Sequence, residues 1–218
     1  CTRCRFANRG MPLTVANLLA RASFSQIDDN ASLVARLLSS RAMTLTFISS
    51  FHASLQWIDK IHIQSRWIRD VLHLNGVPDE KIALIEMGVS QEPIDASIDC
   101  PSAFNAARPM RLVFAGRCTD IKGIETILEA LMKLPNDAPI EISLLGPDWE
   151  SAYGQRLLAP FALDQRLLPP RQVSSDVMLS ELAPHDACLI PSVWLETGPL
   201  AAYEAMAAGL PVIGSRLG

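Results

Sequence analysis

The chain has 218 residues, of which 49% are hydrophobic and 19% are charged, and its formal net charge is −4. This length is sufficient for one large domain or two small domains with hydrophobic cores. No extended basic stretch indicates a nucleic-acid partner, and no apolar run reaches the roughly 18 residues that a transmembrane helix needs. A secretory signal peptide is not recognisable either.

Five cysteines, an odd number, argue against a disulfide framework in a chain of this size. Cys118 and Cys188 lie at the ends of apolar runs, and we expect both to be thiols of a hydrophobic core. Cys1 and Cys4 have the Cys-x-x-Cys spacing of half a zinc or redox site, but no second half follows at ligand spacing. The pair alone does not decide whether it binds metal, and no metal site is predicted elsewhere.

The first part of the chain is predicted to be helical and then to form a strand–helix–strand unit. Apolar residues at helical spacing predict two helices within residues 12–40, with Asn30 as the N-cap of the second. Alternating and buried apolar patterns then predict a strand, a helix and a strand over residues 60–64, 66–74 and 82–87. Such a unit favours a parallel sheet.

Residues 93–109 are interpreted as a linker, because three prolines punctuate a segment with little periodicity. Residues 1–92 then belong to one domain and residues 110–218 to another. In the second, strands are predicted at 111–115, 140–145, 187–190 and 212–215, and helices at 124–134, 149–161, 176–182 and from Pro199. This alternation predicts an α/β fold with a doubly wound parallel sheet.

Open parallel sheets bind ligands beyond the C-terminal ends of their strands, and three of these predicted ends carry suitable residues. Gly116 and Arg117 follow the first strand, Gly146 follows the second, and Pro191-Ser192 leads from the third toward Glu196. Arg117 can hold a phosphate through two parallel hydrogen bonds. Lys122 is predicted to begin the next helix, where a cation opposes the helix dipole unless an anion lies between them. This misfit points to a bound anion.

The segment from Ser192 to Pro211 is the most informative part of the sequence. Pro199 suits the first turn of an Ala-rich helix, and Gly209 suits the left-handed residue after its last turn. Glu196 therefore precedes the helix and Glu204 lies within it. Carboxylates beside a helix N-terminus, which attracts anions, suit a ligand that has both phosphates and hydroxyls. A nucleotide sugar is such a ligand.

Two stretches together resemble the donor-binding signatures of GT-B glycosyltransferases, most closely the retaining family 4. They are Val113-Phe-Ala-Gly-Arg117-x4-Lys122-Gly123 and Pro191-Ser-x3-Glu196-Thr-Gly-Pro-Leu-x3-Glu204-Ala-x-Ala-Ala-Gly209-x-Pro-Val. The resemblance covers about residues 60–218 and rests on the combination in order. It implies an incomplete C-terminal donor domain, together with a remnant of an N-terminal Rossmann-like, acceptor-side domain.

The resemblance also implies a role for each residue. Arg117 and Lys122 would bind the donor diphosphate, Glu204 the ribose hydroxyls and Glu196 the hydroxyls of the transferred sugar. Phosphate or sugar oxygens would meet the amides of Gly198 and Leu200, and the donor-binding set also includes Gly116 and Gly146. Arg117, Lys122 and Glu196 would be the catalytic residues. The nucleobase would lie near residues 169–173, where the usual family glycine is absent.

The implied activity is a hexosyltransferase of polysaccharide biosynthesis that moves a sugar, with retention, from a nucleotide-diphosphate sugar to a saccharide or lipid-linked acceptor. Because the sequence has no Asp-x-Asp, no metal and no cofactor are expected. The expected location is the cytoplasm, either free or peripheral to a membrane. A non-catalytic nucleotide-sugar-binding module and another GT-B enzyme, such as a sugar-nucleotide epimerase, are the alternatives. The chain starts with Cys1 and has no histidine at the family's catalytic position, so we expect an inactive fragment.

Overall fold

The computed structural model describes residues 12, 14, 15, 17, 40–89 and 104–217. The chain divides into two compact units, Cys1–Ile61 with Gly76–Ala83 and His62–Asn75 with Leu84–Gly218. Most of the predicted helices within residues 12–40, as well as Cys1 and Cys4, lie outside the described residues. Most of the predicted linker does too, so the division of the chain at residues 93–109 stays a prediction.

The first described stretch begins with a helix that the sequence patterns did not indicate. Helix α4 (Ser40–Ser54) is followed by the 3-10 helix η1 (Leu55–Trp57). Its sequence of serines, threonines and scattered apolar residues lacks one continuous apolar face, which is why periodicity did not reveal it. The end of η1 is fixed by Lys81, whose Nζ donates to the carbonyl of Leu55 at 2.7 Å and also to that of Ile58.

The predicted strand–helix–strand order is present. Strand β1 (Ile61–Ile63) precedes helix α5 (Arg66–Leu74), and the 3-10 helix η2 (Asp79–Lys81) precedes strand β2 (Ile82–Leu84). Helix α5 has the predicted bounds, whereas β2 ends three residues earlier than expected. Within the described residues, no helix has the length and apolar character needed to cross a membrane.

Four strands of the second unit form a parallel sheet. They are β3 (Met110–Ala115), β4 (Ile140–Leu145), β5 (Ala187–Ile190) and β6 (Val212–Gly214), in the order β4-β3-β5-β6. Every pairing is parallel, and Val113 of β3 lies between Ser143 of β4 and Cys188 of β5. The chain passes from β3 outward to β4 and then returns to β5 on the other side of β3. This reversal is the switch point at which such sheets bind ligands.

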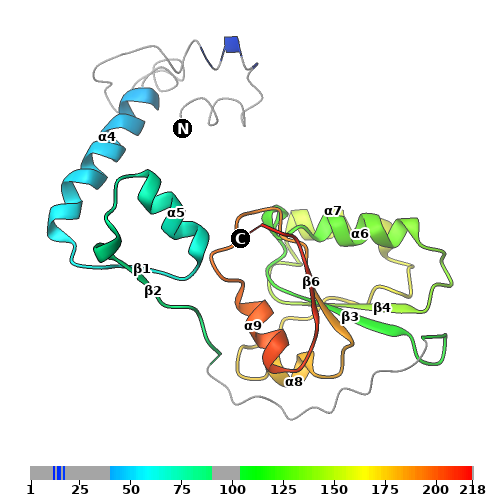
Figure 1. The fold of residues 1–218 in the computed structure, drawn as a ribbon. Helices are drawn as coiled ribbons and strands as arrows, with labels where there is room; N and C mark the ends of the chain where they lie inside the picture. The colour runs from blue at the N-terminus through cyan, green and yellow to red at the C-terminus, as the bar shows by residue number, and fades with distance from the viewer. Residues whose placement is uncertain (1–11, 13, 16, 18–39, 90–103, 218) are drawn as a thin grey trace. The chain divides into compact units, whose positions relative to one another are not determined.

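Helices cover both faces of this sheet (Figure 1). One layer contains α6 (Ile124–Lys133), α7 (Ala152–Leu158) and the 3-10 helix η4 (Ala159–Phe161), and the other contains α8 (Met178–Leu182) and α9 (Leu200–Ala207). Alternate strand residues fill the two cores, so Phe114 packs in the cluster of α6 and Val113 in the cluster of α8 and α9. The predicted doubly wound α/β fold is confirmed, although the helix expected over residues 149–161 is shorter.

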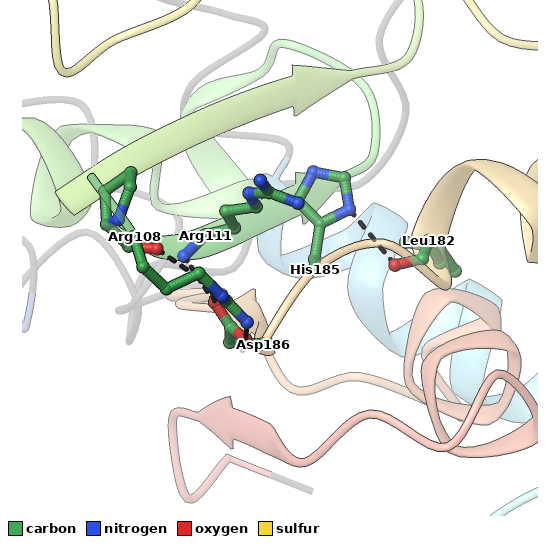
Figure 2. A network of polar contacts seen from close by, with 6 residues as sticks. Arg108, Arg111, Leu182, His185 and Asp186 are labelled. Carbon is green, nitrogen blue, oxygen red and sulfur yellow. Dashed lines mark hydrogen bonds and ion pairs between the residues drawn. The ribbon is translucent and has the colours of Figure 1, made fainter. Parts of the chain in front are cut away.

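The N-terminal ends of β3 and β5 are joined by an ion pair. Arg108 donates two hydrogen bonds, of 2.9 and 2.7 Å, to the carboxylate of Asp186, and the backbone N–H of Arg111 donates to the same group at 2.7 Å (Figure 2). The bonds from Arg108 outweigh burial and lower the pKa of Asp186. The strand ends opposite the switch point are thereby fixed.

His185 lies next to this ion pair and has a structural role. Its Nδ1 is 3.0 Å from the carbonyl oxygen of Leu182 (Figure 2). Its Nε2 is 2.8 Å from Oγ of Ser143. Burial lowers the pKa of the imidazole, which favours the neutral form. The other histidines are exposed, as expected for surface residues: His52, His62 and His73.

Candidate functional site

The loops after β3 and β4 are hydrogen-bonded to each other at the C-terminal edge of the sheet. The N–H of Gly116 donates to the carbonyl of Leu145 at 2.8 Å, and that of Cys118 donates to the carbonyl of Pro147 at 3.0 Å. Gly146 has a φ of 134°, and a Cβ there would lie 2.2 Å from the Gly116 carbonyl oxygen. Only glycine permits this approach. Arg117, which follows Gly116 in the first of these loops, is exposed.

Lys122 does not begin the helix, contrary to the expectation from sequence. It ends the 3-10 helix η3 (Asp120–Lys122), and α6 begins at Ile124. Gly123 separates them with a left-handed φ of 72°. A Cβ on Gly123 would lie 1.9 Å from the carbonyl oxygen of Pro191, so this turn packs directly against the backbone that follows β5.

An ion pair joins these two loops. Lys122 Nζ lies 2.6 Å from Oε1 of Glu196, and the hydroxyl of Ser192 donates to the same oxygen at 2.7 Å. Burial opposes ionisation of Glu196, but the hydrogen bonds from Lys122 and Ser192 outweigh it and lower the pKa of the carboxyl. The anion that Lys122 was expected to require is therefore supplied by the protein itself.

A cavity of about 380 Å³ lies at the switch point. It is lined from the loops after β3, β4 and β5 and from the start of α9. Six of the eight predicted donor-binding residues line it: Gly116, Arg117, Lys122, Gly146, Leu200 and Glu204. The structure therefore brings together residues that are up to 88 positions apart, counting from Gly116 to Glu204.

The other two predicted residues are placed differently. Glu196 lines a smaller cavity of about 120 Å³, which shares Ile190, Ser192 and Pro199 with the larger one. Gly198 lines neither of these two cavities, and its φ of 138° turns the chain toward α9. Glu196 thus reaches the larger cavity through its bond to Lys122.

Helix α9 contributes its N-terminus and one carboxylate. It begins at Leu200 with Pro199 as N-cap, one residue later than predicted, and Gly209 follows its end with the expected left-handed φ of 78°. Burial raises the pKa of Glu204, and no hydrogen bond or ion pair to its carboxylate is found among the described residues. A partly buried acceptor without a cation suits hydroxyl donors.

Sequence reasoning did not assign a role to Ser192, which is only 3% exposed. Its position directly after a buried strand was visible, but its bond to Glu196 depends on how the loop folds. The cavity lining includes Val173, which lies in the segment 169–173 that was expected near the nucleobase. Met178, which also lines the cavity, was not predicted as a site residue, because an apolar residue within a predicted helix is an ordinary core candidate.

The described cysteines are core thiols, as expected. Cys118 and Cys188 are free and buried. Burial is the main cause of the raised pKa of both thiols, and that of Cys188 rises to about 12. Within residues 40–89 and 104–217, no group of three or more His, Cys, Asp or Glu side chains is arranged to hold a metal ion.

Residues 109–218, just over half of the chain, match the family described as glycosyl transferases group 1. The chain belongs to this family. Its relatives include an uncharacterized glycosyltransferase of Methanocaldococcus jannaschii, 26% identical over 68% of this chain and 40% of the relative. Another is the putative colanic acid biosynthesis glycosyltransferase WcaL of Escherichia coli, 30% identical over 64% of this chain and 35% of the relative.

Solved structures show the same fold. HepE of Anabaena, in complex with UDP and glucose, has a TM-score of 0.62 and 19% identity, with 79% of this chain and 49% of that chain covered. The lipopolysaccharide outer core galactosyltransferase WaaB has a TM-score of 0.56 and 18% identity, with 72% and 43% covered. This group 1 chain therefore has a partial GT-B fold, and it spans less than half the length of these relatives.

Gly123→Ala is expected to destabilise the protein by about 1–3 kcal/mol, because a Cβ at a left-handed residue meets the Pro191 carbonyl. Denaturant unfolding measures this change. The matched control is Gly88→Ala, since a Cβ at Gly88 has nothing within 4 Å. Equal unfolding midpoints for the two variants would contradict the assigned contact.

Glu204→Gln is expected to raise the melting temperature of the ligand-free protein at neutral pH. A carboxyl with a raised pKa contributes most stability when protonated, and that stability is lost as the pH rises through the pKa of the folded state. The amide removes this cost, so its advantage should shrink as the pH falls toward the ordinary Glu value of 4.5. Thermal unfolding across this pH range tests it, and a glutamine variant that is less stable at every pH would refute the expectation.

Proposed function

We propose that this chain carries the donor site of a hexosyltransferase of polysaccharide biosynthesis, of the retaining family 4 type. The enzyme moves a sugar from a nucleotide-diphosphate sugar to a saccharide or lipid-linked acceptor. The observation that carries the proposal is the cavity at the switch point, whose lining contains Arg117 and Lys122 as well as Glu204 and the start of α9. A ligand with a diphosphate at one end and hydroxyls at the other matches this distribution of charge.

The diphosphate is assigned to the cationic part of the cavity. The guanidinium of Arg117 has no ion pair or hydrogen bond with any described residue, so it can bind phosphate oxygens. Lys122 also lines the cavity, and the amides at the start of α9 supply further donors. These groups take the place of a metal ion, since the sequence has no Asp-x-Asp.

The ribose and the base of the donor are assigned to residues away from Arg117 and Lys122. The Glu204 carboxylate accepts hydrogen bonds from the ribose hydroxyls. The base lies toward an adjoining cavity of about 760 Å³, which shares Gly146 and Pro147 with the first and also contains Pro170 and Gln172. The solved complexes of HepE with UDP-glucose support a nucleotide sugar as the ligand class.

Catalysis follows from where charge develops. When the bond between sugar and diphosphate breaks, negative charge grows on the leaving diphosphate and positive charge grows on the sugar. Arg117 and Lys122 stabilise the leaving group more in the transition state than in the ground state, which lowers the barrier. Glu196, held by Lys122, stays close to the leaving group and accepts from the hydroxyls of the transferred sugar.

We assign the donor site to the described residues. We assign acceptor recognition to regions of the kind that lie outside the matched part of the relatives. The chain spans 35% and 40% of two of its relatives. We therefore propose that the 218 residues alone bind the donor without transferring the sugar. The location, cytoplasmic or peripheral to a membrane, stays a prediction.

The first test is calorimetric titration of UDP, GDP, ADP and their glucose and mannose conjugates, each with EDTA and with Mg²⁺. One nucleotide is expected to bind at about micromolar Kd without metal, and Glu204→Ala should abolish this binding. If no nucleotide binds under either condition, the donor site is refuted. Binding without sugar transfer by the full-length protein would favour the non-catalytic module, and epimerised product would favour the other GT-B chemistry.

Lys122→Ala in the full-length protein is expected to lower kcat/KM at least about tenfold, a loss of roughly 1.4 kcal/mol of transition-state stabilisation. Steady-state transfer assays with the nucleotide sugar that binds in the titration measure this loss. Lys133→Ala, which removes an exposed lysine at the end of α6, is the matched control and should stay at the wild-type value. A change smaller than twofold for Lys122→Ala would remove the assigned role.

A further inference from the structure

We propose that Ser192 is a positioning residue that fixes the Glu196 carboxylate for recognition of the donor's sugar hydroxyls. This inference rests on the proposed function, in which Glu196 contacts the transferred sugar. It assigns Ser192 a role that the sequence patterns did not indicate. The role is exerted through Glu196 and needs no contact between Ser192 and the donor.

The hydroxyl of Ser192 is held in place by its surroundings. Ser192 is 3% exposed and lies two residues after the end of β5. The N–H of the next residue, Val193, donates to the carbonyl of Ile121 at 3.0 Å, and the Pro191 carbonyl packs against Gly123. Because its backbone is anchored on both sides and its side chain has a single torsion to a heavy atom, the serine loses little entropy when it bonds to Glu196.

The two oxygens of Glu196 are used differently. Oε1 accepts from the Ser192 hydroxyl at 2.7 Å and from Lys122 Nζ at 2.6 Å. Oε2 has no partner among the described residues. One oxygen is thus committed to the protein, and the other is left as an acceptor for a hydroxyl of the ligand.

Ser192 supplies a hydrogen bond to Glu196 that does not depend on Lys122. Lys122 has a long, flexible side chain, and in the proposed function it also contacts the donor diphosphate. When phosphate oxygens compete for its ammonium group, the orientation of Glu196 depends more on the serine bond. A hydrogen bond that does not change with donor occupancy therefore keeps the sugar subsite formed while the diphosphate binds.

The test compares ligands with and without a sugar. UDP, UDP-glucose, GDP and GDP-mannose are titrated into the wild-type protein and into Ser192→Ala and Ser192→Thr. Ser192→Ala should bind UDP and GDP with affinities within about twofold of wild type. For the sugar conjugate that the wild-type protein binds, UDP-glucose or GDP-mannose, it should lose about tenfold in affinity, equivalent to about 1.4 kcal/mol. The threonine variant keeps the hydroxyl and should recover most of this loss. Ser180→Ala, which removes an exposed hydroxyl on α8, should behave as wild type.

The pH dependence separates positioning from a general structural effect. Two hydrogen bonds to the charged form lower the pKa of Glu196, so wild-type preference for the sugar conjugate should fall only at low pH. Loss of the Ser192 bond raises that pKa, so the midpoint should move to higher pH in Ser192→Ala. A purely structural serine would instead weaken UDP and UDP-glucose binding alike and leave the midpoint in place.

The outcomes distinguish the two proposals. If the wild-type protein binds none of the four ligands, the proposed function fails and this inference fails with it. If the wild-type protein prefers a sugar conjugate, and Ser192→Ala keeps both that preference and the midpoint of its pH dependence, Ser192 has no positioning role. The proposed function then still stands. Should Ser192→Ala not fold, NMR titration of the Glu196 carboxyl in the wild-type protein decides, because a pKa at or above 4.5 overturns the inference.

Discussion

Direct backbone packing between the turn at Gly123 and the loop at Pro191 is the contact on which the site depends. No side chain fits between them, since a Cβ on Gly123 would lie 1.9 Å from the Pro191 carbonyl oxygen. The hydrogen bond from Val193 to Ile121 holds the same two loops together. These loops follow neighbouring strands, β3 and β5, at the point where strand order reverses. Lys122 and Glu196 are brought to 2.6 Å because the backbones that carry them cannot be separated by even one methyl group.

This ion pair determines the charge of the cavity before any ligand arrives. Glu196 largely neutralises Lys122, while Arg117 has no ion pair with any described residue. Glu204 also lines the cavity; burial raises its pKa, and its carboxylate forms no ion pair with any described residue. The cavity therefore has a cationic part and an acidic part, and a ligand that is anionic throughout would suit only the first. A molecule with phosphates at one point and hydroxyls at another would suit both, and for this reason we propose a nucleotide sugar rather than a simple phosphate as the ligand.

Local patterns predicted much of this fold, and contacts between distant segments account for the rest. Helix α5 and strands β4 and β5 have their predicted bounds, because caps, turns and apolar runs mark them within a few residues. Lys122 was placed at a helix start because the sequence does not show that Gly123 adopts a left-handed φ. The partner of Lys122 lies 74 positions away, and no spacing rule connects it to Glu196. The role of Ser192 was missed for the same reason. Gly116, Arg117 and Gly146 were found because the strand ends of a parallel sheet converge, whereas Leu200 and Glu204 of α9 were assigned through the family resemblance.

The pairing of Lys122 with Glu196 also bears on selectivity. Leaving either charge partly buried and unpaired costs free energy, so the ligand-free site keeps the two together. A bare diphosphate competes with Glu196 for Lys122 and offers that carboxylate nothing in return, and a free sugar lacks the charge to attract Lys122. In the proposed function, a nucleotide sugar supplies phosphate oxygens to the lysine and a hydroxyl to Oε2 of Glu196, which has no partner among the described residues. The ion pair therefore favours a ligand in which the diphosphate and the sugar are covalently joined. The bond between these two groups is the one that a glycosyltransferase breaks.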